Sequence, residues 1–426
     1  ASRFDARQLL RTGTGRIGVD RIEAGGFDNL SLLVHGPLSF DGDVALNLGQ
    51  SLRLYAASYA HSDAAAAGSS VSLSAPYVRL AGVRRPKVPD DSTMPEAGWA
   101  QGPSTQVPDG TFAVAADLID VRDRVGFGAR ATVELRTSNY AMDRRGFAAV
   151  ELTSRGDIRL LGGMGSEGLT DITTELATAG NLALTAAQAY PATDASARIL
   201  AGVMPRDPAS GETPRYAEGS VLAIRRHGDG EVATPYSAFG SLRLGAETIE
   251  QGGILRAPLG RLQLGSNFTG EVAERVTLLA GSETSVSGAG LQMPYGGTVD
   301  GLSYRYGGQA VTPVGAGGME GSAAVRRGIG FNARHVDAQA GSLLDLSGGG
   351  TLSGAGFATG RGGSVDVLAT PLANANPFNG YSDRRSGVYA IVPGSAASYA
   401  PVAPEAGFGA PGVGQQVTLP AGVPGL

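Results

Sequence analysis

The chain has 426 residues, of which 66 are glycine, 42% are hydrophobic and 17% are charged, with a formal net charge of -5. The absence of cysteine excludes disulfides, thiol catalysis, iron–sulfur clusters and cysteine-based zinc sites, and it fits export through an oxidising compartment. The negative charge argues against a nucleic-acid-binding surface. No apolar run approaches the ~18 residues of a membrane-spanning helix, and the scattered histidines predict no metal and no cofactor.

Short alternating runs bounded by glycine, asparagine, aspartate, serine or proline recur along the chain and predict β-strands. Few stretches show the i, i+3, i+4, i+7 apolar pattern of a helix. The clearest runs, in chain order, are residues 30–32, 44–48, 51–54, 71–73, 132–135, 157–160, 181–184, 241–244 and 261–264.

The spacing of these runs predicts how the strands are arranged. The Leu-x-Leu pair at 30–32 recurs 22 residues later at 52–54, and the pair at 242–244 recurs 20 residues later at 262–264. Strand repeats of this length indicate a solenoid, in which neighbouring coils bury each other's apolar faces. We therefore expect an all-β parallel β-helix with glycine at its corners.

An array of β-sandwiches is the structural alternative, because sandwich strands pair mostly antiparallel through tight hairpins. The sequence offers few hairpin turns: Asp109-Gly110, and residues 227–230 between the apolar runs 221–224 and 231–234. We expect the second to form a hairpin that projects from the solenoid.

The composition divides the chain into coils and interruptions. We expect β-helix coils at 1–81, 111–188, 237–287 and 321–369. We expect four other segments: a proline-rich extrusion at 82–110, an inserted small β module at 189–236, a Gly/Tyr-rich extrusion at 288–320 and a Pro/Ala/Gly-rich tail at 370–426.

Several segments resemble a conserved region of large exoproteins of the filamentous haemagglutinin family. These segments are residues 180–193, 242–258, 294–304, 344–357 and 361–367, and the similar region extends over roughly residues 110 to 400. The resemblance implies a Gram-negative substrate of two-partner secretion, which passes through an outer-membrane β-barrel transporter and folds outside the cell as a right-handed β-helix. The family's secretion domain carries Asn-Pro-Asn-Leu motifs, which this chain lacks. We therefore expect an internal or C-terminal part of such an exoprotein, exported through a domain not in this chain.

Two short motifs have a functional and a structural interpretation. Residues 13–18 match G-x-G-x-x-G, but a dinucleotide site needs a preceding strand and a following helix, and residues 19–26 alternate like a strand. Arg155-Gly156-Asp157 is the integrin-type tripeptide, which needs both charged groups on an exposed turn. The alternative is that this tripeptide is the turn-to-strand frame of the solenoid.

Clustered charges at 117–124 suggest a second kind of site. Asp117, Asp120 and Asp123, with Arg122 and Arg124, are the residue types of a calcium or lyase site assembled across stacked coils. A solvated strand face is the alternative. Residues 362–366 lack the third glycine of the calcium-binding nonapeptide.

Aromatic side chains in the expected extrusions are candidate ligand contacts. Tyr295, Tyr304 and Tyr306 lie in a glycine-rich stretch, and Trp99 lies in the proline-rich one. Exposed aromatic rings stack on sugars or anchor protein contacts. The alternative is that they pack their own loops onto the solenoid.

The sequence therefore predicts a shaft or display segment of a secreted bacterial surface adhesin, which binds a host cell-surface glycan or protein and is not an enzyme. Two alternatives remain open at this stage. One is a β-helical polysaccharide lyase or glycosidase, and the other is the rod of a contact-dependent toxin-delivery exoprotein.

Overall fold

The computed structural model describes fifteen stretches of the chain. They are residues 15–34, 36–56, 58–83, 107–132, 139–142, 145–162, 174–193, 195–203, 216–265, 272–291, 296–299, 303–306, 309–311, 328–350 and 354–357.

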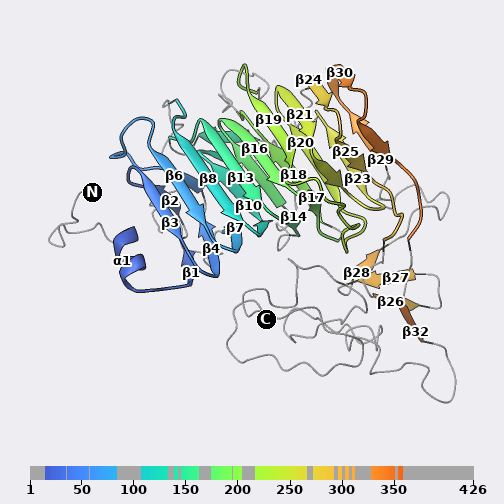
Figure 1. Cartoon of the computed structure of the whole chain (residues 1–426), viewed down its shortest axis with the longest axis horizontal. Helices are drawn as coiled ribbons and strands as arrows, with labels where there is room; N and C mark the ends of the chain where they lie inside the picture. Colours follow the sequence, from blue (N-terminus) through green and yellow to red (C-terminus); the bar gives the residue numbers. More distant parts are fainter. Residues whose placement is uncertain are drawn as a thin grey trace, which may run out of the picture.

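Three long parallel sheets, named A, B and C here, build the molecule (Figure 1). Sheet A contains, in spatial order, β1 (Asn29–Leu33), β4 (Ser51–Ala56), β7 (Tyr77–Gly82), β9 (Leu118–Arg122), β14 (Asp157–Leu161), β17 (Gln188–Pro191), β22 (Ile254–Arg256), β25 (Glu283–Ser285) and β31 (Leu343–Asp345). Sheet B contains β2 (Pro37–Phe40), β5 (Ser58–His61), β10 (Arg124–Phe127), β15 (Thr174–Thr178), β18 (Ser196–Leu200), β20 (Ser241–Gly245), β23 (Arg261–Leu264) and β29 (Gly328–Phe331). Sheet C contains β3 (Val44–Asn47), β6 (Ser70–Ser74), β8 (Thr111–Ala116), β13 (Ala149–Ser154), β16 (Asn181–Ala186), β19 (Val221–Arg226), β21 (Thr248–Gly252), β24 (Ala273–Leu278) and β30 (Ala333–Ala338).

The chain visits the sheets in the order A, B, C, and successive coils stack along the long axis (Figure 1). The expected parallel β-helix is thus confirmed. The Leu-x-Leu repeats are stacked neighbours, since Leu30 pairs with Leu52 and Leu242 pairs with Leu262. The sandwich alternative fails because strand pairing within all three sheets is parallel.

Inward side chains from successive coils form continuous apolar ladders. The ladder of sheet C runs through Val71, Phe112, Val150, Leu182, Leu222, Ile249 and Val276. These side chains are buried and belong to one hydrophobic core that extends from Ile22 to Val286. At one end, Ile22 on the short helix α1 (Val19–Ala24) inserts into this core.

Glycine is required where two corners stack closely. A Cβ atom on Gly260 would lie 1.9 Å from the carbonyl oxygen of Gly240 in the preceding coil. The backbone N–H of Arg261 donates to that same oxygen at 3.0 Å. A Cβ atom on Gly240 would itself lie 2.7 Å from Cγ of Pro191, so a glycine directly precedes both β20 and β23.

The inserted module expected at 189–236 is wrong. β18 and β19 continue sheets B and C of the solenoid, where β18 pairs in parallel with β15 and β20, and β19 with β16 and β21. The expected hairpin at 227–230 is wrong as well, since residues 231–234 form no strand. Instead residues 227–240 form a loop that replaces the sheet A strand of this coil, so β17 pairs directly with β22.

Other strands lie outside the three sheets. β11 (Ala129–Thr132) and β12 (Asn139–Met142) form an antiparallel hairpin. β28 (Gln309–Val311), β27 (Ser303–Tyr306), β26 (Gly296–Val299) and β32 (Gly354–Phe357) form a separate sheet, which contains the strands of the predicted extrusion at 288–320. Residues 84–106 of the predicted proline-rich extrusion and all of 370–426 lie outside the described residues.

The ladders predict a sharp contrast between neighbouring residues of one strand. Leu152 on β13 is buried in the core, and Thr153 beside it faces outward. Leu152→Ala should lower the free energy of unfolding by about 2–5 kcal/mol because it leaves a cavity between coils. Thr153→Ala should change it by no more than about 0.5 kcal/mol. Urea unfolding measures both, and equal costs would contradict the inward assignment of Leu152.

Candidate functional site

Polar residues form a column on the outer face of sheet A. Strand register places Arg53, Arg79, Asp120, Arg159 and Tyr190 side by side on β4, β7, β9, β14 and β17. Each is flanked along its strand by residues of the core, so alternation directs these side chains outward. Four of these residues are charged, and sheet B carries a run of equal length in Arg124, Glu175, Arg198 and Arg243.

Asp120 is the centre of this column and is fully buried. The Tyr77 hydroxyl donates to its Oδ2 atom at 2.6 Å, and Arg159 donates through Nε to Oδ1 at 2.7 Å and through a terminal nitrogen to Oδ2 at 3.0 Å. Arg79 lies 3.5 Å from Oδ2. Burial alone would raise the pKa of Asp120, but these donors hold the pKa below its usual value. The carboxylate is therefore ionised and joins three consecutive coils.

Asp157, the first residue of β14, has the opposite environment. It is 3% exposed, and burial raises its pKa to about 6, against the effect of hydrogen bonds from Tyr190 and Gln188. Gln188 donates to Oδ2 over 3.4 Å, and no described group donates to Oδ1. With so few donors, the buried carboxyl group keeps its neutral form up to about pH 6.

Arg256 on β22 fastens the loop of residues 227–240 to this face. Its guanidinium makes a two-pronged ion pair with Glu283 at 2.7 and 3.1 Å. It also donates to the backbone carbonyls of Val232 and Ala233, both at 2.9 Å. One cation thus holds two neighbouring coils and the loop that lies outside them.

These contacts link neighbouring coils to one another. Asp120 accepts hydrogen bonds from three side chains, so it is a poor base for removing a proton from a ligand. Within the described part of the chain, no group of three or more His, Asp and Glu side chains could hold a metal ion. The arrangement can bind coils to one another and fix their register.

The predicted set at 117–124 is not brought together. Asp117 lies at the corner before β9, where it pairs with Arg155, and Asp123 lies at the corner before β10 with a φ of 59°. Asp120, which stands between these two residues in the sequence, is fully buried. The solvated strand face is therefore wrong for Asp120 as well, because an arginine of the next coil neutralises it.

The integrin-type interpretation of Arg155-Gly156-Asp157 is wrong. The Arg155 side chain is 71% exposed and pairs with Asp117 at the neighbouring corner. Asp157 is buried and begins β14. The two charged groups therefore do not share an exposed turn, and the tripeptide is a turn-to-strand corner of the solenoid.

The other candidate residues lie mostly outside the described part of the chain. Trp99 and Tyr295 lie outside the described residues, and Tyr304 and Tyr306 lie on β27, whose backbone alone is described. The strand expected at 19–26 is wrong, since Val19–Ala24 form helix α1. The residues before the G-x-G-x-x-G match, where a dinucleotide site needs a strand, lie outside the described part of the chain.

The sequence did not single out Tyr77, Arg79, Arg159 or Arg256. A usable signal does exist, because Arg79, Asp120 and Arg159 each stand between two aliphatic residues of a strand. A charge in that position faces away from the core on every coil. Only the register shows that these charges stack on one another.

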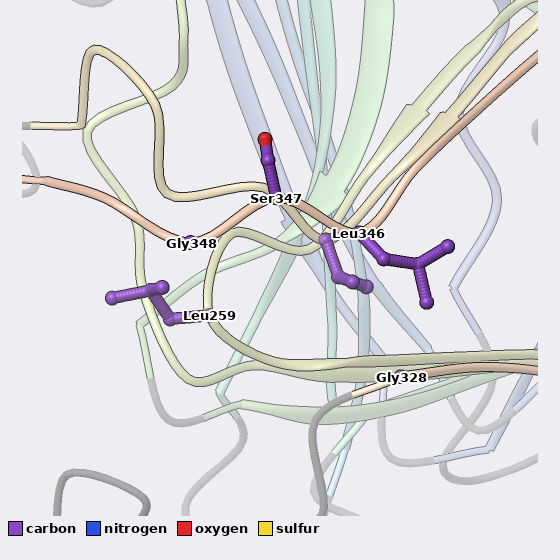
Figure 2. Close-up of a pocket in the computed structure, with 6 residues that line it drawn as sticks. Leu259, Gly328, Leu346, Ser347 and Gly348 are labelled. Atoms are coloured by element: carbon purple, nitrogen blue, oxygen red, sulfur yellow. The ribbon is translucent and has the colours of Figure 1, made fainter.

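A small pocket lies at the corner between sheets A and B near the last described coil (Figure 2). Leu259, Val286, Leu346 and Ser347 contribute to its lining. Its volume of about 110 Å³ is well below the ~300 Å³ at which ligand pockets begin. It therefore supports no small-molecule site.

Comparison of the chain with protein-family models, curated proteins and solved structures gives no match. The resemblance to filamentous haemagglutinin exoproteins accordingly stays a prediction. No helix in the described part of the chain is long and apolar enough to cross a membrane.

Removing the central carboxylate should destabilise the stack. Asp120→Asn leaves Arg79 and Arg159 without their shared anion, so we expect a loss of about 3 kcal/mol in the free energy of unfolding at pH 7. The control is Glu250→Gln, which breaks a half-exposed pair with Arg225 and should cost at most about 1 kcal/mol. A loss no larger than that of the control would show that the Asp120 contacts contribute little.

Asp157 should make stability depend on pH. Its folded pKa of about 6 lies above the ordinary value of 3.8, so its contribution is fully present at pH values below that ordinary value and is lost as pH rises through 6. The wild type should therefore lose about 2 kcal/mol relative to Asp157→Asn between pH 4 and 7. Urea unfolding of both proteins at each pH gives the difference, in which other titrating groups cancel. A pH-independent difference would contradict the raised pKa.

Proposed function

We propose that the described coils form the rigid shaft of a secreted bacterial surface adhesin, which displays binding segments and catalyses no reaction. The observation that carries the proposal is the Asp120 cluster. Its members Tyr77 and Arg79, Asp120, and Arg159 come from three consecutive coils and bond to one another. Charged groups on the outer face of a β-helix are available either to a ligand or to their neighbours, and here they bind their neighbours.

The continuous core supports the same function. One hydrophobic cluster extends along the stack, so bending the rod would separate ladder residues from one another. Such a rod holds whatever projects from it at a fixed distance from its anchor. The proposed partner is a host cell-surface glycan or protein, with Trp99, Tyr295, Tyr304 and Tyr306 as proposed contacts.

The proposed location is the surface of a Gram-negative bacterium or the medium around it. Two features of the sequence support it: the absence of cysteine, and the segments that resemble filamentous haemagglutinin exoproteins. Export would use an outer-membrane two-partner transporter that recognises a domain not in this chain.

A glycosidase is the second candidate, and one observation favours it. Asp120 and Asp157 lie on neighbouring strands of sheet A, and their environments shift their pKa values in opposite directions. Two carboxyl groups separated in this way are the usual acid and base, or acid and nucleophile, of glycoside hydrolysis. Against it, both carboxyl groups are buried.

One experiment separates the two candidates. The purified chain is incubated with pectins, alginates and glycosaminoglycans, with and without calcium, while reducing ends and unsaturated products are followed. The same glycans and cultured cells are used to measure binding. We expect binding without sustained product, and about tenfold weaker binding after Tyr304→Ala with Tyr306→Ala. Tyr236→Ala is the control, because Tyr236 is an exposed tyrosine on the loop of residues 227–240.

Sustained turnover that is abolished by Asp157→Asn would favour the glycosidase function over the shaft function. Absence of any binding by the unmodified chain would contradict the display function of this segment. Equal loss of binding in the tyrosine variants and the Tyr236 control would remove the special role of Tyr304 and Tyr306.

A further inference from the structure

The last described coil leaves part of its apolar ladders uncovered. β29, β30 and β31 are the final strands of sheets B, C and A in the described part of the chain, at the end opposite α1 (Figure 1). Val336 and Leu344 occupy inward positions, stacked on Val276 and Thr284. Val336 is 49% exposed and Leu344 39%, whereas Val276 and Thr284 are 0% exposed. Exposed apolar side chains beside open strand edges invite pairing with another chain.

The backbone of β30 directs hydrogen-bonding groups toward this open side. The N–H of Gln339 donates to the carbonyl oxygen of Leu278 in the preceding coil at 2.9 Å, and backbone groups alternate in direction along a strand. Asp337 therefore faces β24 as Gln339 does, whereas the N–H and C=O of Val336 point away from β24. In the described part of the chain, no strand of sheet C lies beyond β30. A strand added there would bond to Val336.

We propose that this end binds the same end of a second copy of the chain, with β30 pairing antiparallel with its counterpart about a two-fold axis. A two-fold interface uses one surface patch on both copies, so the patch must be complementary to itself. Centring the axis on Val336 places this residue opposite its own counterpart, and the two valines exchange both backbone N–H···O=C bonds. Both valine side chains lie on the inward side, so each covers the ladder of the other copy.

The charges on β30 favour this register over its neighbours. His335 and Asp337 flank Val336 on the outer face, and both are exposed. In the proposed pairing, His335 of each copy lies opposite Asp337 of the other, in the non-hydrogen-bonded pairs where side chains come closest. An imidazole N–H donates to a carboxylate whether or not the ring is charged. A slip of two residues would instead place either the two His335 side chains or the two Asp337 side chains opposite each other.

The same axis brings the other two sheet edges into contact. Because the axis passes through sheet C, it exchanges sheets A and B, and β31 of one copy lies over β29 of the other. The exposed Leu344 on β31 then meets Ile329 and Phe331, the partly buried inward residues of β29 that pack against the core. The apolar core thus continues from one copy into the next.

The structure of the opposite end favours a closed dimer over a fibre. There Ile22 of α1 is buried in the core, so the first coils already have a cover. Head-to-tail stacking needs two open ends on each copy, whereas the two-fold arrangement needs only one and leaves both covered ends outside. The proposed partner is therefore one further copy of this chain, and this proposal does not depend on the proposed function.

Single cysteines test the partner and the register together, because the chain has no cysteine of its own. Full chains with His335→Cys and with Asp337→Cys carry different affinity tags, and they are coexpressed, purified together and oxidised mildly. The mixed sample should form a covalent dimer about tenfold faster than either variant alone, since only positions 335 and 337 lie opposite each other. Equal or faster cross-linking of either variant alone, or no cross-link in any sample, would overturn the proposal.

Sedimentation of the full chain measures the association itself. The unmodified chain should sediment with twice its mass of 43.1 kDa. Val336→Asp places two like charges opposite each other on the axis and should weaken association about tenfold. The matched control Leu33→Asp adds the same charge at an exposed leucine of the first coil and should leave association unchanged. Unchanged hydrogen exchange in β20 and β23 of both variants shows that the stack stays folded. A monomer at every concentration, or equal effects of the two variants, would contradict the proposed dimer.

Discussion

Contact between the inward side chains of neighbouring coils is the interaction on which the rest of this structure depends. A single coil consists of three short strands and cannot bury its own inner face. Phe112, for example, is fully buried because Val71 lies on one side of it and Val150 on the other. Stability is therefore shared between neighbours, and each end of the stack is a special case. Ile22 of α1 meets that requirement at the first coils.

The apolar ladders do not fix the register by themselves. A slip of one residue would turn every inward side chain outward, but a slip of two residues keeps the inward pattern. The outward charges distinguish these alternatives. In the observed register Arg159 lies beside Asp120, whereas a slip of two toward Arg122 would place two arginines side by side. The buried pair of Glu175 and Arg198 on sheet B acts in the same way, because a slip would place Glu175 opposite Ser196 or Leu200. Conformational specificity is a known use of buried ion pairs.

The sequence could predict the fold because the coil step is visible wherever coils are short. Leu242 and Leu262 are successive inward residues of sheet B, and only β21, β22 and their short corners lie between them. It could not predict the coil through β18 and β19, because that coil lacks a sheet A strand and its inward Ala197 is a weak apolar signal. The turn residues at 227–230 then suggested a hairpin, although they belong to a loop held by Arg256.

The polar column was harder to predict, for a related reason. Tyr77 and Asp120 are 43 residues apart, and Asp120 and Arg159 are 39 apart. These separations depend on how much chain is inserted between the coils, so no fixed spacing marks the cluster. The charged positions can be recognised one strand at a time, but their partners follow only from the register.

The connections between strands differ in length according to the sheets that they join. Corners from sheet C to sheet A are mostly tight, such as the single residue Asp117 between β8 and β9. The longer connections follow sheet B or sheet A: β10 to β13 and β18 to β19 run from sheet B to sheet C, and β14 to β15 and β25 to β29 run from sheet A to sheet B. Parallel strands of one sheet stack about 4.8 Å apart, so the strand ends that these connections follow lie along two edges of the solenoid. Chain inserted at these edges interrupts neither a ladder nor the Asp120 cluster, and the proposed shaft that displays binding segments would need this property.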